Sequence, residues 1–177
     1  ASQLFGDAPG ETFHKAVDAI QKGFRAVKLG WGPFGKSTLE ADERQLEAAR
    51  LGLGAEAHLM VDVGMVWGED VEQAAQRLPA LKAAEVTWLE EPFPGGALSA
   101  YAALSQRQPR VPLAGGEGSH NFFTAAHMVD HARLRYLQID AGRVGGISAA
   151  RRIAAYAQAK GVTYVNHTFT SHLALSA

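Results

Sequence analysis

Three carboxylates occur in matching contexts along this chain, each directly after a short apolar or glycine-rich run. Asp62 follows Leu-Met-Val, Glu90 follows Thr-Trp-Leu and Glu117 follows Ala-Gly-Gly, at nearly equal intervals of 28 and 27 residues. Each context is typical of the end of a buried strand. Converging carboxylate oxygens suit a hard divalent cation, and Mg²⁺ fits best because it keeps positions open for water or substrate. We therefore expect these three residues to bind Mg²⁺.

The segments between the carboxylates indicate why they should converge. Each interval holds one helix-like stretch, so the chain reads as strand, loop and helix, repeated. Strands are expected at residues 2–5, 24–29, 58–61, 86–89, 111–114, 134–139 and 162–165. Eight such units, about 250 residues, form a parallel barrel whose C-terminal strand ends ring one face. We predict an α/β fold, an incomplete TIM-like (β/α) barrel of about seven strands, as one catalytic domain over 1–177 that lacks the last strand.

Three further ionisable residues fall at expected strand ends. Lys28 lies near the end of the second strand, although a solvated surface lysine is an equally good interpretation of the pattern. Asp140 and His167 end the sixth and seventh strands, which are neighbours in this fold, so the carboxylate could orient the imidazole and raise its basicity. A purely structural pair is the alternative.

Each of these residues has a simpler structural explanation. A single carboxylate after a strand is more often a helix N-cap than a metal ligand. Three in consecutive units would repel one another at a shared barrel mouth, which favours a cation between them.

Two tryptophans and one histidine also have two interpretations each. Trp31 and Trp67 follow strand ends and either wall the mouth or pack in the core. His120, three residues after Glu117, either touches substrate or only occupies its loop.

Composition excludes several classes of function. The 177 residues are 47% hydrophobic and 20% charged, as in an ordinary globular chain. The chain has 17 Lys and Arg residues and 18 Asp and Glu residues, which gives a formal net charge of -1 at pH 7. This net charge gives no electrostatic attraction to nucleic acid or to an anionic membrane. The lack of cysteine excludes disulfides and thiolate chemistry. We expect a cytoplasmic protein that binds neither nucleic acid nor membrane.

Taken in order, these residues resemble the enolase superfamily, specifically its mandelate racemase group. The resemblance covers almost the whole chain and is most specific at Ala26–Lys28, Leu59–Asp62, Trp88–Pro92, Gly116–Glu117, and Asp140 with Gly145–Ile147. It implies that Asp62, Glu90 and Glu117 bind Mg²⁺. It also implies that Asp140 pairs with His167 and that Lys28 belongs to the base-bearing second strand.

The chain departs from the family pattern in three respects. The family commonly has Lys-x-Lys on the second strand, whereas this chain has Lys28-Leu-Gly30, so the usual second base is absent. Many members have Asn two residues after the first metal ligand, where this chain has Gly64. We also expect these 177 residues to hold neither the family's N-terminal capping domain nor the last strand of the barrel. We therefore expect one-sided acid–base chemistry through His167.

The resemblance implies a small carboxylate substrate, an acid sugar, and a homo-oligomer when the protein is full length. It also implies chemistry at the carbon next to the substrate carboxylate. Mg²⁺ would stabilise the charge that develops as the α-proton leaves, and His167, oriented by Asp140, would move the proton. Loss of a β-hydroxyl would then make the protein an acid-sugar dehydratase, a hydro-lyase. Racemisation or epimerisation of a 2-hydroxy acid is the alternative reaction. A barrel that only binds metal or a partner, without catalysis, is the alternative of another class.

Overall fold

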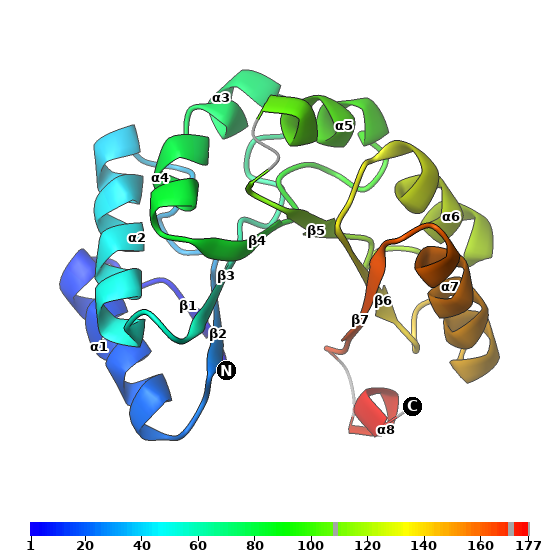
Figure 1. Cartoon of the computed structure of the whole chain (residues 1–177), viewed down its shortest axis with the longest axis horizontal. Coiled ribbons are helices and arrows are strands. Elements are labelled where there is room, and N and C mark those ends of the chain that lie inside the picture. The colour runs from blue at the N-terminus through cyan, green and yellow to red at the C-terminus, as the bar shows by residue number, and fades with distance from the viewer. Residues whose placement is uncertain (108–109, 170–171, 177) are drawn as a thin grey trace.

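The fold is a curled sheet of parallel strands wrapped by helices. The computed structural model describes residues 1–107, 110–169 and 172–176. Its strands are β1 (Ser2–Leu4), β2 (Ala26–Gly30), β3 (His58–Asp62), β4 (Val86–Glu90), β5 (Leu113–Gly115), β6 (Tyr136–Asp140) and β7 (Thr163–His167). They pair in sequence order, and every pairing is parallel. The sheet curls so that β2 and β7 face each other across the inside of the curl (Figure 1).

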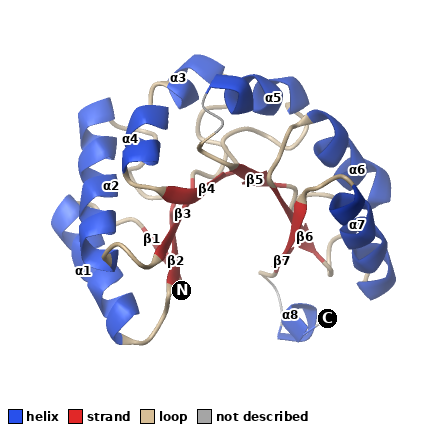
Figure 2. Ribbon diagram, in the orientation of Figure 1, coloured by secondary structure: helices blue, strands red, loops and turns tan. Residues whose placement is uncertain are grey.

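All the helices but the last lie outside the curl, along the convex side of the sheet, and the last one lies at the open side of the curl, beyond β7 (Figure 2). The helices are α1 (Pro9–Gln21), α2 (Leu39–Leu53), α3 (Val71–Ala75), α4 (Leu78–Ala83), α5 (Leu98–Arg107), α6 (Phe122–His131), α7 (Ile147–Ala159) and α8 (His172–Ser176). This arrangement confirms the predicted α/β fold, an incomplete TIM-like barrel. Within the described residues, no helix combines the length and the apolar character needed to cross a bilayer.

Several strands begin and end later than the sequence predicted. The second strand starts at Ala26 rather than at position 24, because Gly23, with φ of 86°, follows the end of α1 and Phe24 remains exposed before the strand. The sixth and seventh strands also extend further. As a result Asp140 and His167 are the last residues of β6 and β7.

The register of the sheet decides which side chains share a layer. One row across β2, β3 and β4 consists of fully buried apolar side chains, Leu29, Val61 and Leu89. The next row is Gly30, Asp62 and Glu90, also in register. Because successive side chains in a strand point to opposite faces, this second row turns to the inside of the curl. Lys28, two residues before Gly30, shares that inner face one layer deeper.

A buried ion pair fixes the loop that follows β2. Arg77, between α3 and α4, donates from Nε to Oδ2 of Asp42 at 2.7 Å, and both side chains are almost fully buried. The other carboxylate oxygen of Asp42 accepts the backbone N–H of Gly35, while Arg77 also donates to the carbonyl of Ser37. The pair therefore ties the loop to α2 and to the α3–α4 junction.

Loss of this pair should destabilise the fold. Arg77→Ala in the full-length protein leaves the Asp42 charge buried without compensation, which should lower the free energy of unfolding by about 3–5 kcal/mol. The matched control is Arg107→Ala, because Arg107 pairs with Glu72 where the two side chains are 55% and 63% exposed. That loss should be under about 1 kcal/mol. Urea titration measures both, and equal effects would contradict the assigned role of the buried pair.

Candidate active site

The inner row at the ends of β3 and β4 forms a compact group of charges around Lys28. The Lys28 ammonium lies 2.5 Å from Oε1 of Glu90 and 3.2 Å from Oδ2 of Asp62. The indole N–H of Trp88 donates to the other oxygen of Glu90 at 2.9 Å. Glu90 is completely buried, so both of its oxygens depend on these partners.

The electrostatics of this group follow from burial and crowding. Burial raises the pKa of Glu90 and the nearby charge of Asp62 raises it further, while Lys28 and Trp88 act in the opposite direction. Burial alone would lower the pKa of Lys28, but its contacts with Glu90 and Asp62 outweigh burial and raise it. Lys28 therefore stays protonated near neutral pH and offsets the negative charge at this side of the mouth.

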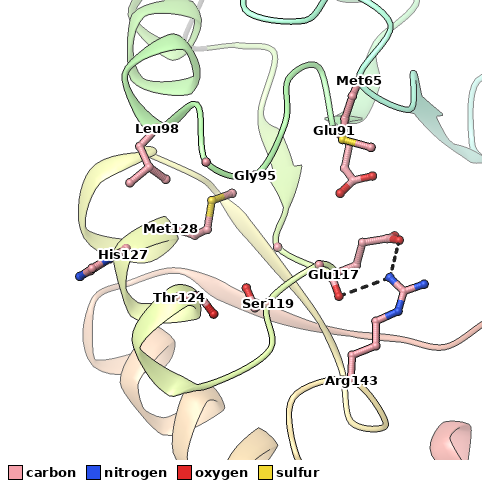
Figure 3. Close-up of a pocket in the computed structure, with 13 residues that line it drawn as sticks. Met65, Glu91, Gly95, Leu98, Glu117, Ser119, Thr124, His127, Met128 and Arg143 are labelled. Carbon is pink, nitrogen blue, oxygen red and sulfur yellow. Dashed lines mark hydrogen bonds and ion pairs between the residues drawn. The ribbon is translucent and has the colours of Figure 1, made fainter.

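A second group joins the ends of β5, β6 and β7. Nδ1 of His167 lies 3.0 Å from Oδ2 of Asp140, and Nε2 lies 2.9 Å from Oε2 of Glu117. The other oxygen of Asp140 accepts the backbone N–H groups of Gly142 and Arg143, which fixes the carboxylate. The Arg143 guanidinium donates to Oε1 of Glu117 at 3.0 Å (Figure 3). Glu117 thus lies between a guanidinium and an imidazole.

These contacts also set the protonation of the second group. The hydrogen bond to Glu117 raises the pKa of His167 although burial opposes it, and Asp140 adds to the increase. The same hydrogen bond lowers the pKa of Glu117, with Arg143 contributing. Burial would raise the pKa of Asp140, but its bonds to His167 and to two backbone N–H groups keep it low. His167 is therefore a more basic imidazole than a free one.

Glu91 connects the two groups. Its backbone has φ of 45°, and in Figure 3 its carboxylate points into the space that Glu117 and Arg143 also border. Burial raises the pKa of Glu91 to about 7, and the charges of Glu117, Asp62 and Glu90 add to the increase. All four carboxylates therefore act on one region of the mouth.

The donor set fits a divalent cation, although the side chains are paired differently in this structure. Across the described ranges, no three acidic or histidine side chains are arranged to hold one metal ion. Instead, Lys28 binds Asp62 and Glu90, and Glu117 binds His167 and Arg143. Oxygen donors that repel one another in a partly buried space are nevertheless what Mg²⁺ binds well. That the three residues predicted from the sequence share one Mg²⁺ stays a prediction.

The other residues singled out in the sequence lie in different places. Trp67 is buried, and its ring N–H donates to the carbonyl of Gly35, so it packs in the core. Trp31 is 55% exposed directly after β2. A cavity of about 570 Å³ extends from Glu117 and Arg143 over the start of α6 (Figure 3). His120 is exposed and does not line this cavity.

Three residues of the site were missed in the sequence. Side-chain alternation would turn Glu91 away from the face that Glu90 occupies, and only its positive φ brings it to the mouth. Arg143 lies in a glycine-rich loop whose path the sequence does not reveal. Trp88 lies two residues before Glu90 on the same face of β4, a spacing that could have suggested the contact.

The raised pKa of Glu91 predicts a pH-dependent stability. An acid whose pKa is higher in the folded state stabilises the fold at low pH, and that contribution is lost as pH rises through the folded pKa. The free energy of unfolding of full-length protein in EDTA should therefore fall between about pH 4.5 and 7. Glu91→Gln should match the unaltered protein near pH 4.5 and exceed it near pH 7.5 by on the order of 2–3 kcal/mol.

A matched control separates this effect from general charge removal. Glu43 is exposed on α2, so Glu43→Gln should leave the pH profile unchanged. Denaturant titration at each pH measures the difference. Parallel profiles for Glu91→Gln and the unaltered protein would show that Glu91 does not titrate at the mouth as described.

The amino-acid sequence is similar to those of known enzymes and matches one family model. The model of the enolase C-terminal domain-like family matches residues 11–177. D-galactarolactone cycloisomerase of Agrobacterium fabrum is 31% identical over 171 residues, which are 97% of this chain and 43% of that protein. L-talarate/galactarate dehydratase of Salmonella typhimurium is 31% identical over 168 residues, 94% of this chain and 41% of that protein.

Solved structures show the same fold. A structure described as a predicted mandelate racemase from Rhodobacter sphaeroides superposes with a TM-score of 0.96 at 60% identity, covering 100% of this chain and 45% of that one. A racemase from Streptomyces coelicolor with bound magnesium gives a TM-score of 0.82 at 28% identity, covering 91% and 43%. The chain thus spans less than half the length of each of these relatives.

Proposed function

The chain belongs to the mandelate racemase group of the enolase superfamily, and we propose that it carries the central part of the active site of a Mg²⁺-dependent acid-sugar dehydratase. The observation that carries the proposal is the division of the mouth into two sides. Carboxylates and Lys28 lie on the β2–β4 side, and an imidazole held by Asp140 lies on β7. The name of the dehydratase contains sugar acids and that of the cycloisomerase contains the lactone of a sugar acid, which supports this substrate class.

The metal would bind through Asp62, Glu90 and Glu117. When bound, Mg²⁺ would supply a Lewis acid that stabilises negative charge on the substrate carboxylate as the α-proton leaves. Lys28 would remain charged beside Glu90 and Asp62, where it offsets the excess negative charge that one divalent cation leaves.

His167 would carry out the proton transfers. Asp140 holds Nδ1, so Nε2 is the nitrogen that faces the mouth, and it is there that Glu117 now binds. Nε2 would take the α-proton and return a proton to the β-hydroxyl as the carbon–oxygen bond breaks. Water leaves, and tautomerisation of the enol gives a 2-keto-3-deoxy acid. Asp140 also raises the pKa of His167, and this contribution would remain once Glu117 leaves Nε2, which makes the imidazole a better base for the first of these steps.

Gly30 supports elimination over racemisation. A Cβ at Gly30 would lie 2.9 Å from both Cβ and the carbonyl oxygen of Asp62, so a side chain there would have to displace the end of β3. The β2 side therefore offers no base in this position, whereas racemisation normally needs a base on each face of the α-carbon. Racemisation is kept as the second candidate, because the racemase of Streptomyces coelicolor shares the fold and Lys28 lies on the side of β2.

Isotope exchange distinguishes these reactions. Full-length protein with Mg²⁺ should be incubated in D₂O with a library of acid sugars, and 2-keto acid and deuterium in both α-epimers should be measured. We expect 2-keto acid from at least one sugar, loss of turnover in EDTA, and no formation of the opposite epimer. His167→Asn should lower turnover by about 10²–10⁴ because it removes the general base.

The control is His131→Asn, because His131 is exposed at the end of α6. It should keep full activity. Exchange into both epimers at similar rates would establish racemisation instead. Mg²⁺ binding without turnover of any acid sugar would favour a barrel that only binds metal.

A further inference from the structure

Three bulky or charged residues adopt left-handed backbone conformations in the loops that follow successive strands. They are Trp31 after β2, Met65 after β3 and Glu91 after β4, with φ of 58°, 63° and 45°. Such values are rare for residues with a side chain, and they cluster at functional sites. Of the three, Trp31 has the bulkiest side chain, and it is 55% exposed, against 41% for Met65.

We propose that Trp31 is the specificity-determining wall on the β2 side of the mouth and that its indole binds the C–H face of a polyhydroxy acid. This inference rests on the proposed function, since it names the part of the acid sugar that the β2 side would recognise.

The backbone places Trp31 beside the carboxylate row. Its backbone N–H donates to the backbone carbonyl of Asp62 at 3.0 Å. Trp31 therefore lies next to the row formed by Gly30, Asp62 and Glu90. Because β2 and β7 face each other across the curl, Trp31 follows a strand opposite the one that ends in His167 (Figure 1). A substrate held between them would have the base on one face and the indole on the other.

Gly64 makes room for the indole. A Cβ at Gly64 would lie 3.1 Å from Cε2, 3.2 Å from Cζ2 and 3.4 Å from Cδ2 of Trp31. Similar distances to three adjoining ring atoms mean that Gly64 lies against the face of the ring. Gly64 itself has φ of 53°, a conformation that favours glycine. One face of the indole is thus supported by backbone.

The indole of Trp31 is available to a ligand, unlike those of the other two tryptophans. Trp67 donates its ring N–H to Gly35 and Trp88 donates to Glu90. Within the described part of the chain, the ring N–H of Trp31 has no recorded acceptor, and the side chain is 55% exposed. The Arg77 network holds the loop that carries Trp31, so the exposed ring is attached to a fixed support.

The chemistry of the ring defines the ligand. An indole offers an apolar face and one N–H donor. A sugar acid offers C–H groups along its carbon chain and hydroxyl groups that can accept that N–H. Trp31 would therefore favour acids with an extended polyhydroxy chain, whereas a short 2-hydroxy acid would place nothing against the ring.

Kinetics of the full-length enzyme with Mg²⁺ and its best acid sugar test this inference. Trp31→Ala should raise KM about tenfold while kcat changes less than about threefold, because ring contacts act on binding. Trp31→Phe should restore KM to within about threefold, and Trp31→Leu, which keeps apolar volume without a ring, should not. The control is Phe24→Ala, an exposed aromatic just before β2, which should leave KM unchanged.

Fluorescence provides a second readout that does not depend on turnover. An unreactive epimer of the sugar should change the tryptophan emission of the unaltered enzyme, and Trp31→Phe should abolish that change. Unchanged KM in both Trp31→Ala and Trp31→Leu, with turnover intact in the unaltered enzyme, would overturn the inference alone. Failure of the unaltered enzyme to turn over any acid sugar would overturn the proposed function, and with it this inference.

Discussion

Crowding of negative charge at one end of the sheet is the constraint on which the rest of the site depends. Asp62, Glu90, Glu91 and Glu117 act on the same region, and burial makes each uncompensated charge unfavourable. In this structure Lys28, Arg143 and His167 provide the compensation. A divalent cation could replace part of it, which would release His167 from Glu117 for proton transfer. Metal binding and exposure of the base would then be linked.

Parallel strand pairing produces this crowding from residues far apart in the sequence. In-register pairing places Asp62 beside Glu90, and Asp140 beside His167, at strand ends that face the same side. The apolar row beneath them, which includes Leu29 and Leu89, is fully buried and keeps the register, because a slip of one residue would turn the charges toward the helices. Rigid strands therefore fix the positions, while the loops after them supply Trp31, Glu91 and Arg143.

The features that repeat along the chain were predictable, and those that depend on loop conformation were not. Periodic strand–helix units gave the fold and placed Asp62, Glu90, Asp140 and His167 at strand ends. The position of Glu91 depends on a left-handed backbone conformation at a single residue, which side-chain alternation does not foresee. The sequence also left open whether Trp31 and Trp67 wall the mouth or pack, because burial depends on the path of each loop. The predicted start of β2 was wrong by two residues, because Gly23 and the exposed Phe24 precede the strand.

The most direct measurement of the central claim is a crystal structure of the full-length protein with Mg²⁺ and an unreactive acid sugar. The account predicts one Mg²⁺ with oxygens of Asp62, Glu90 and Glu117 at about 2.0–2.1 Å. It also predicts Nδ1 of His167 still on Asp140, with Nε2 turned from Glu117 to the α-carbon of the ligand. A metal held by other residues, or a site in which Glu117 remains paired only with His167 and Arg143, would contradict it.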